Sequence, residues 1–153
     1  MRIIGKKTRD RHPGEDALVR QPFDDRCRGN RQADGHFVEE GLVETFNARD
    51  LDALMDCMAE DCAFHAAAGP GAEGAMHQGR AAVRAAYAAI LAAFPQAEWT
   101  EGRHSVAGDT GLSSWRFRGT TAEGAAVDVR GCDLFTFDGE RIALKDSYRK
   151  ARG

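Results

Sequence analysis

Alternating apolar and polar residues near the end of the chain predict a β-hairpin. Successive side chains of a strand point to opposite faces, so every second residue shares a face. One face of this segment carries Val127, Val129, Gly131, Asp133, Phe135 and Phe137. Asp138-Gly139 then separates this run from a second one, and Asp-Gly is a strong signal for a two-residue hairpin turn. We therefore predict two antiparallel strands, 126–137 and 140–149.

The predicted hairpin places two carboxylates on its apolar face. A turn at Asp138-Gly139 sets Asp133 opposite Leu144 and Gly131 opposite Asp146. Asp133 and Asp146 are then diagonal neighbours, roughly 7–8 Å apart. A few polar groups in an apolar wall are typical of a ligand pocket. The alternative is structural, because an inward-facing Asp can also cap a loop or pair with a nearby Arg.

The rest of the chain is predicted to form helices followed by strands. Apolar residues at three- and four-residue steps predict helices at 36–48 and 81–94, the latter stopped by Pro95. Asp50 is a suitable N-cap for a short helix between them, whose apolar stripe runs to Met58. The remaining elements are a short strand at 62–66, a loop at 67–79, and strands at 97–107 and 111–120. This order predicts an α+β fold.

Composition separates an N-terminal extension from the domain. Residues 1–33 hold nine Lys or Arg and five Asp or Glu, with scattered apolar residues and no period. We predict a basic, disordered extension over 1–33 and one folded domain over 34–153. The extension mixes both charge signs and holds a single aromatic residue, Phe23, which argues against nucleic-acid binding. No apolar run approaches the ~20 residues that span a membrane, and no signal-peptide core is present, so we expect a cytoplasmic protein.

No metal or cofactor site is predicted. The four cysteines show no Cys-x-x-Cys spacing, and we expect them to be reduced thiols. Zinc held by Cys62, His65, His77 and His104 lacks the usual ligand spacing.

Several short segments occur in an order that resembles the nuclear transport factor 2-like superfamily, and within it the SnoaL-like group. They are Asn47 to Asp52, Ala59 to Cys62, Gly79-Arg80 before a helix, Ala93-Phe94-Pro95, Gly108-Asp109, Trp115 to Thr120, and Gly131 to Ile142. The resemblance implies a cone-shaped α+β barrel, in which three N-terminal helices wrap a curved antiparallel sheet around one pocket. It also implies a homodimer.

The resemblance gives Asp133 a candidate role. Asp133 matches the ketosteroid isomerase aspartic acid that stays protonated and donates a hydrogen bond to an enolate oxygen. The isomerase's tyrosine falls on Leu42 and its general base on Ala66, which argues against a steroid isomerase mechanism. His65 could replace the base only if its strand turns inward, and a His near a strand end is more often structural.

We therefore expect a SnoaL-like pocket protein for a small hydrophobic molecule. As an enzyme it would be a cofactor-independent isomerase, cyclase or lyase, transferring protons on a carbonyl compound. The alternative is a non-catalytic ligand-binding or dimerisation module. The predicted catalytic residues are Asp133, Asp146 and His65. The predicted pocket lining is Tyr87, His104, Trp115, Phe117, Phe135, Leu144 and Tyr148.

Overall fold

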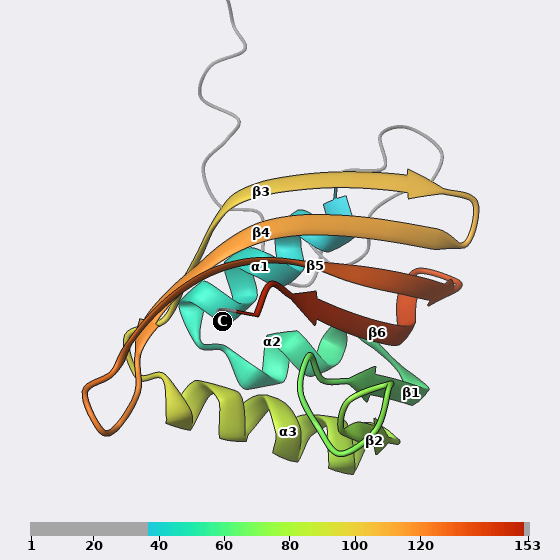
Figure 1. Ribbon diagram of the computed structural model, residues 1–153. Helices are drawn as coiled ribbons and strands as arrows, with labels where there is room; N and C mark the ends of the chain where they lie inside the picture. Colours follow the sequence, from blue (N-terminus) through green and yellow to red (C-terminus); the bar gives the residue numbers. More distant parts are fainter. Residues whose placement is uncertain (1–36, 152–153) are drawn as a thin grey trace, which may run out of the picture.

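The computed structural model describes residues 37–151, which contain three helices and one six-stranded sheet (Figure 1). The helices are α1 (Phe37–Ala48), α2 (Leu51–Asp56) and α3 (Arg80–Ala93). The strands are β1 (Met58–His65), β2 (Met76–Gln78), β3 (Glu98–Ala107), β4 (Thr110–Thr120), β5 (Ala126–Asp138) and β6 (Arg141–Arg149). The predicted boundary between residues 33 and 34 lies outside the described residues.

The helices follow the sequence signals closely. The Asp50 carboxylate accepts a hydrogen bond from the Ala53 amide at 3.0 Å, which confirms Asp50 as the N-cap of α2. α3 buries Val83, Ala86, Tyr87 and Leu91 along one side. The stripe predicted to run on to Met58 is wrong, because α2 ends at Asp56 and Met58 opens β1.

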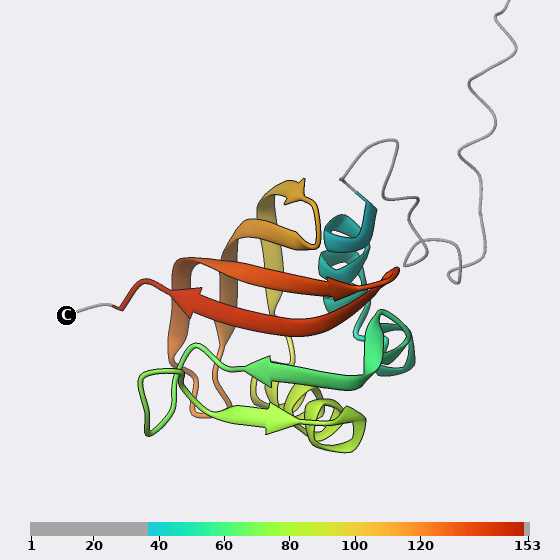
Figure 2. The same ribbon diagram turned by 90° about the vertical axis from the view of Figure 1, so that its right-hand side faces the viewer.

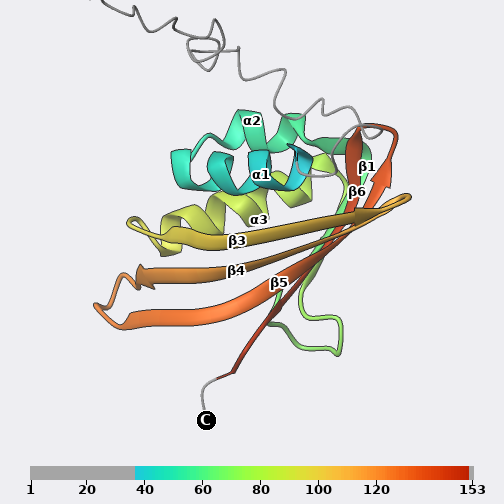
Figure 3. The same ribbon diagram turned by 90° about the horizontal axis from the view of Figure 1, so that it is seen from above.

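The sheet is curved and open, with the strand order β2-β1-β6-β5-β4-β3. All three helices lie on one face of it (Figure 3). The predicted α+β class is confirmed, but the sheet does not close into a barrel. β1 pairs with β6 in parallel, and β2 forms inside the segment predicted as a loop, antiparallel to β1 (Figure 2). Sequence alternation did not indicate either pairing.

Side chains at the end of α1 form hydrogen bonds with β3 and with the end of α3. The Asn47 side chain makes two hydrogen bonds of 2.9 Å with the backbone of Trp99 on β3. Arg49, at a φ of 58°, donates to the carbonyl oxygens of Phe94 and Leu91 at the end of α3. These carbonyls are among those that a helix end leaves without an internal partner. The two side chains thus hold α1, α3 and β3 together.

The predicted register of the β5–β6 hairpin is wrong. Asp138 pairs with Arg141, so the loop is Gly139-Glu140, with Gly139 at a φ of 60°. Phe137 pairs with Ile142 and Thr136 with Leu144, which leaves Ala143 as the extra residue of a β-bulge. A single extra residue reverses the faces of everything beyond it. Leu144, Asp146 and Tyr148 therefore share the face opposite Asp133.

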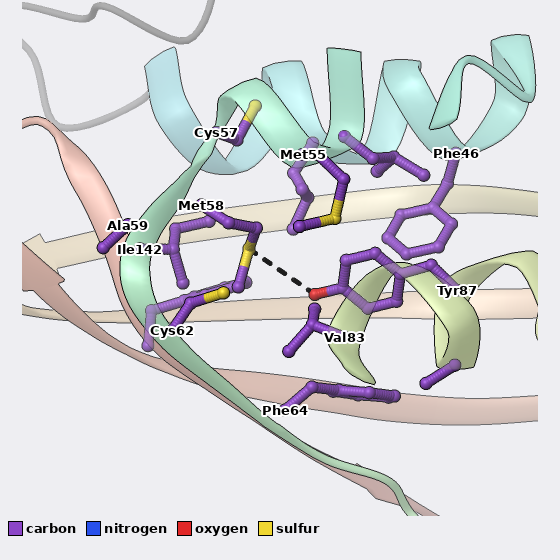
Figure 4. Close-up of a cluster of buried hydrophobic side chains, with 14 of the residues drawn as sticks. Phe46, Met55, Cys57, Met58, Ala59, Cys62, Phe64, Val83, Tyr87 and Ile142 are labelled. Carbon is purple, nitrogen blue, oxygen red and sulfur yellow. Dashed lines mark hydrogen bonds between the residues drawn. The ribbon is translucent and has the colours of Figure 1, made fainter. Parts of the chain in front are cut away.

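The largest buried cluster surrounds Tyr87 between α1, α2, α3 and β1 (Figure 4). Tyr87 is fully buried, with its ring packed edge-on against Phe46 at a centroid distance of 5.1 Å. Its hydroxyl points to the Met58 sulfur at 3.6 Å, and a thioether is a weak acceptor. Burial, and secondly the negative charge of Asp133, raise the pKa of Tyr87 well above its usual value.

Tyr87 is expected to limit stability in alkali. Its phenol ionises near pH 10 in the unfolded chain but stays protonated in the fold, so stability falls above that pH. The loss from one group approaches about 1.4 kcal/mol per pH unit. Tyr87→Phe should remove this alkaline loss of stability while changing the free energy of unfolding at pH 7 by less than about 1 kcal/mol. Urea unfolding at pH 7 and pH 11 measures both. An equal alkaline loss in parent and variant would contradict the assignment to Tyr87.

Candidate functional site

A cavity of about 190 Å³ lies between the helices and the concave face of the sheet. Seven aromatic side chains contribute to its wall: Phe46, Phe64, Phe94, Trp99, Trp115, Phe117 and Phe135. Leu42 and Val43 of α1 and Ile90 of α3 close the helical side. An engineered protein cavity of ~150 Å³ is large enough to bind benzene. The present cavity is therefore of a size for one substituted ring.

A cluster of polar side chains interrupts the aromatic wall on β4, β5 and β6. Oδ1 of Asp133 accepts hydrogen bonds from Lys145 Nζ at 2.9 Å and from Ser147 Oγ at 2.6 Å. Oδ2 of Asp133 accepts one from Trp115 Nε1 at 2.8 Å. Lys145 Nζ also donates to Ser147 Oγ at 2.7 Å. All four residues line the cavity.

The charges in this cluster are almost completely buried. Asp133 is 5% exposed and Lys145 is 6% exposed. The Lys145 ammonium also lies 4.9 Å from the centre of the Phe64 ring and 5.7 Å from that of Phe46. Aromatic faces attract cations, so these rings add to the stabilisation that the carboxylate provides. The cavity thus contains the compensated Asp133–Lys145 ion pair in a mostly apolar wall, which Arg149 also lines.

Gly131 makes room for the Trp115 indole that reaches Asp133. Gly131 pairs with Trp115 across β4 and β5. A Cβ atom at position 131 would lie 2.3 Å from the Trp115 ring and 2.4 Å from the Tyr148 carbonyl oxygen. The absence of a side chain at Gly131 therefore leaves a space that the indole ring fills.

The predicted site residues divide between the two faces of the sheet. Asp133, Trp115, Phe117 and Phe135 line the cavity. Asp146 lies on the convex face, where it accepts a hydrogen bond from the Tyr148 hydroxyl at 2.7 Å. His65 pairs with Asp146 across the parallel strands and does not line the cavity, and Leu144 lines a shallow groove on the convex face. The predicted trio of Asp133, Asp146 and His65 is not assembled.

Two other predicted lining residues lie beside the cavity instead of in its wall. Tyr87 belongs to the core cluster beneath Phe46 and Phe64. His104 pairs with Ser113 across β3 and β4. The His104 ring turns back toward Gly102, where an added Cβ atom would lie 2.9 Å from Nε2.

The sequence analysis missed Lys145, Ser147 and Ser113. Lys145 and Ser147 were assigned to the outer face because the bulge at Ala143 was not foreseen. One signal was available: a carboxylate on an apolar face needs a cation nearby. Lys145 is the first cation along the neighbouring strand after Arg141.

No group of three or more metal-binding side chains occurs within residues 37–151, and no helix there is long and apolar enough to cross a membrane. Among the described residues, Cys62 and Cys132 are free thiols. The cytoplasmic location stays a prediction.

The convex face of the sheet exposes apolar side chains that the fold itself does not cover. Leu112 and Leu134 are directly paired there, and Tyr148 lies nearby on β6; these side chains are 41%, 44% and 50% exposed. A homodimer stays a prediction, and light scattering of the purified protein would decide it.

Comparisons with known proteins agree on the fold. The family model of the SnoaL-like domain matches residues 40–145. A nuclear transport factor 2-like protein of unknown function from Mesorhizobium loti is 28% identical, covering 80% of this chain and 96% of its own, with a TM-score of 0.65. A search among curated proteins finds no match.

Two more distant structures share the fold. A proposed polyketide cyclase from Xanthomonas campestris is 20% identical over 70% of this chain and 83% of its own, with a TM-score of 0.61. TerC, co-crystallised with polyporic acid, is 14% identical over 71% of this chain and 85% of its own, with a TM-score of 0.60.

Breaking the buried pair is expected to destabilise the fold strongly. Asp133→Asn and Lys145→Met should each cost about 3–5 kcal/mol, since each leaves the other charge buried without its partner. The double variant should lose less than the sum of the two single variants. Arg84→Met is the matched control, because Arg84 pairs with Asp52 at 2.6 Å on the surface and such pairs contribute at most about 1 kcal/mol. Urea unfolding at pH 7 measures all four, and additive single costs would contradict the coupling.

Proposed function

Since the chain belongs to the SnoaL-like domain family, we propose that it binds a small, mostly apolar molecule carrying an oxygen function. The observation that carries this proposal is the aromatic cavity with the Asp133 cluster in its wall. Binding sites commonly combine apolar walls with a few placed polar groups. TerC, with the same fold, was crystallised with a small molecule, polyporic acid. A binding role also agrees with the state of the Asp133 carboxylate, because most of its hydrogen-bond positions are occupied by groups of the protein itself.

A panel of one-ring compounds tests whether the cavity binds ligands. We expect cyclohexanone or phenol to raise the melting temperature of the protein and to shift the NMR signals of cavity residues. Val43→Phe, which adds a ring to the helical wall, should weaken this binding at least tenfold. The same kind of substitution on the convex face, Leu112→Phe, should leave binding unchanged. Equal binding by the parent and Val43→Phe would place the ligand elsewhere, and absence of binding by every compound would overturn the proposal.

Proton transfer is the second candidate function, and the juxtaposition of Lys145 and Asp133 favours it. A carboxylate can take an α-hydrogen from a carbonyl compound as a proton. The adjacent ammonium can donate a hydrogen bond to the carbonyl oxygen, which gains negative charge as the enolate forms. Both groups lie in one cavity wall, 2.9 Å apart. Asp133 and Lys145 thus replace the predicted combination of Asp133 with Asp146 or His65.

Hydrogen exchange measures this activity directly. In D₂O, the protein should accelerate the replacement of the α-hydrogens of cyclohexanone by deuterium, followed by NMR. Asp133→Asn removes the base and should return the rate to that of buffer, while Trp115→Phe keeps the carboxylate and should retain part of it. Circular dichroism of each variant confirms that it is folded. If the parent protein binds cyclohexanone without accelerating the exchange, the proton-transfer function is wrong and only the binding function is supported.

A further inference from the structure

Ser113 carries a buried hydroxyl group that forms no hydrogen bond within the described part of the fold. It lies in the middle of β4, is 1% exposed, and lines the cavity. Its Oγ has no hydrogen-bond partner among residues 37–151. A buried polar group without a partner costs free energy, so such groups are rare unless something else binds them.

Ser113 lies directly across from Asp133. The two residues pair in the β4–β5 ladder, and directly opposite residues have Cβ atoms about 4.5–5.5 Å apart on the same face. Within residues 37–151, Oδ1 of Asp133 accepts two hydrogen bonds, but Oδ2 accepts only that of the Trp115 indole. A carboxylate oxygen can accept two, so Oδ2 retains one acceptor position. A hydroxyl and an unused acceptor position therefore belong to neighbouring side chains of the cavity wall.

We propose that Ser113 and Asp133 together select a ligand hydroxyl. The Ser113 O–H donates to the ligand oxygen, and the ligand O–H donates to Oδ2 of Asp133. The ligand class is a monocyclic alcohol or phenol, since the cavity holds about one ring and the pair of contacts requires a group that both donates and accepts. An ether offers only the acceptor, and a hydrocarbon offers neither. This inference rests on the proposed binding function and adds Ser113 as the residue that determines specificity.

Three probes of nearly equal size separate these contacts: phenol, anisole and toluene. Calorimetry on the parent protein should show phenol binding about tenfold more tightly than anisole, the value of one added hydrogen bond. Ser113→Ala should weaken phenol binding by about tenfold and leave toluene binding unchanged. Ser114→Ala is the matched control, because Ser114 is the adjacent serine and its side chain points to the opposite face.

Stability of the empty protein gives a second, independent result. Ser113→Ala removes an unpaired buried hydroxyl, so the ligand-free variant should melt about 2–4 °C above the parent. Ser114→Ala should melt within about 1 °C of it. A group that is destabilising in the empty fold and stabilising in the complex is the signature of a binding residue.

The outcomes distinguish this inference from the function on which it rests. If all three probes bind the parent and the ratio of phenol to toluene affinity is the same in Ser113→Ala, the cavity binds ligands and the role of Ser113 is wrong. If none of the probes binds the parent, both proposals are overturned. A Ser113→Ala variant that melts below the parent would show a hydroxyl already bonded within the fold, which also overturns the inference.

Discussion

The buried pair of Asp133 and Lys145 explains the arrangement of the strands around it. Without the bulge at Ala143, a ladder continuing from Phe137 and Ile142 would set Asp146 directly opposite Asp133. Two carboxylates would then face each other in an aromatic cavity, and Lys145 would point outward. The bulge places an ammonium beside Asp133 instead. Uncompensated buried charge costs far more than one irregular pair in a ladder, so electrostatics favours the observed register.

Much of the fold was accessible from local sequence signals. The period of α3, the cap at Asp50 and the alternation in β4 each depend on residues close together in the chain. In β4, Trp115 and Phe117 lie on the buried face and Arg116 and Arg118 on the other, as the alternation of apolar and polar residues requires. Local signals succeed here because each element has one apolar side, and burying that side decides its orientation.

The candidate site was only partly predictable, because its geometry depends on contacts between distant segments. Asp133 was found from alternation in β5, whereas its partner Lys145 was hidden by the alternation of Ile142 and Leu144 with smaller or polar residues. Such alternation is typical of a regular strand. A β-bulge breaks the alternation, but no particular residue type marks its position in the sequence. Ser113 carries no local signal either, since its importance comes from a missing partner. The parallel pairing of β1 with β6 likewise joins segments far apart in sequence.

The bulge at Ala143 also bears on how the length of this chain could change during evolution. If Ala143 were absent, Leu144 would follow Ile142 directly, and Lys145 would still stand opposite Phe135 in an uninterrupted ladder. Loss of Asp146 would instead move Ser147 to the opposite face of β6 and remove its hydroxyl from the Asp133 cluster. The same one-residue deletion is therefore neutral for the chemistry of the cavity at one point of β6 and disruptive a few residues further along. A relative that lacks the residue at this bulge can retain the same interior.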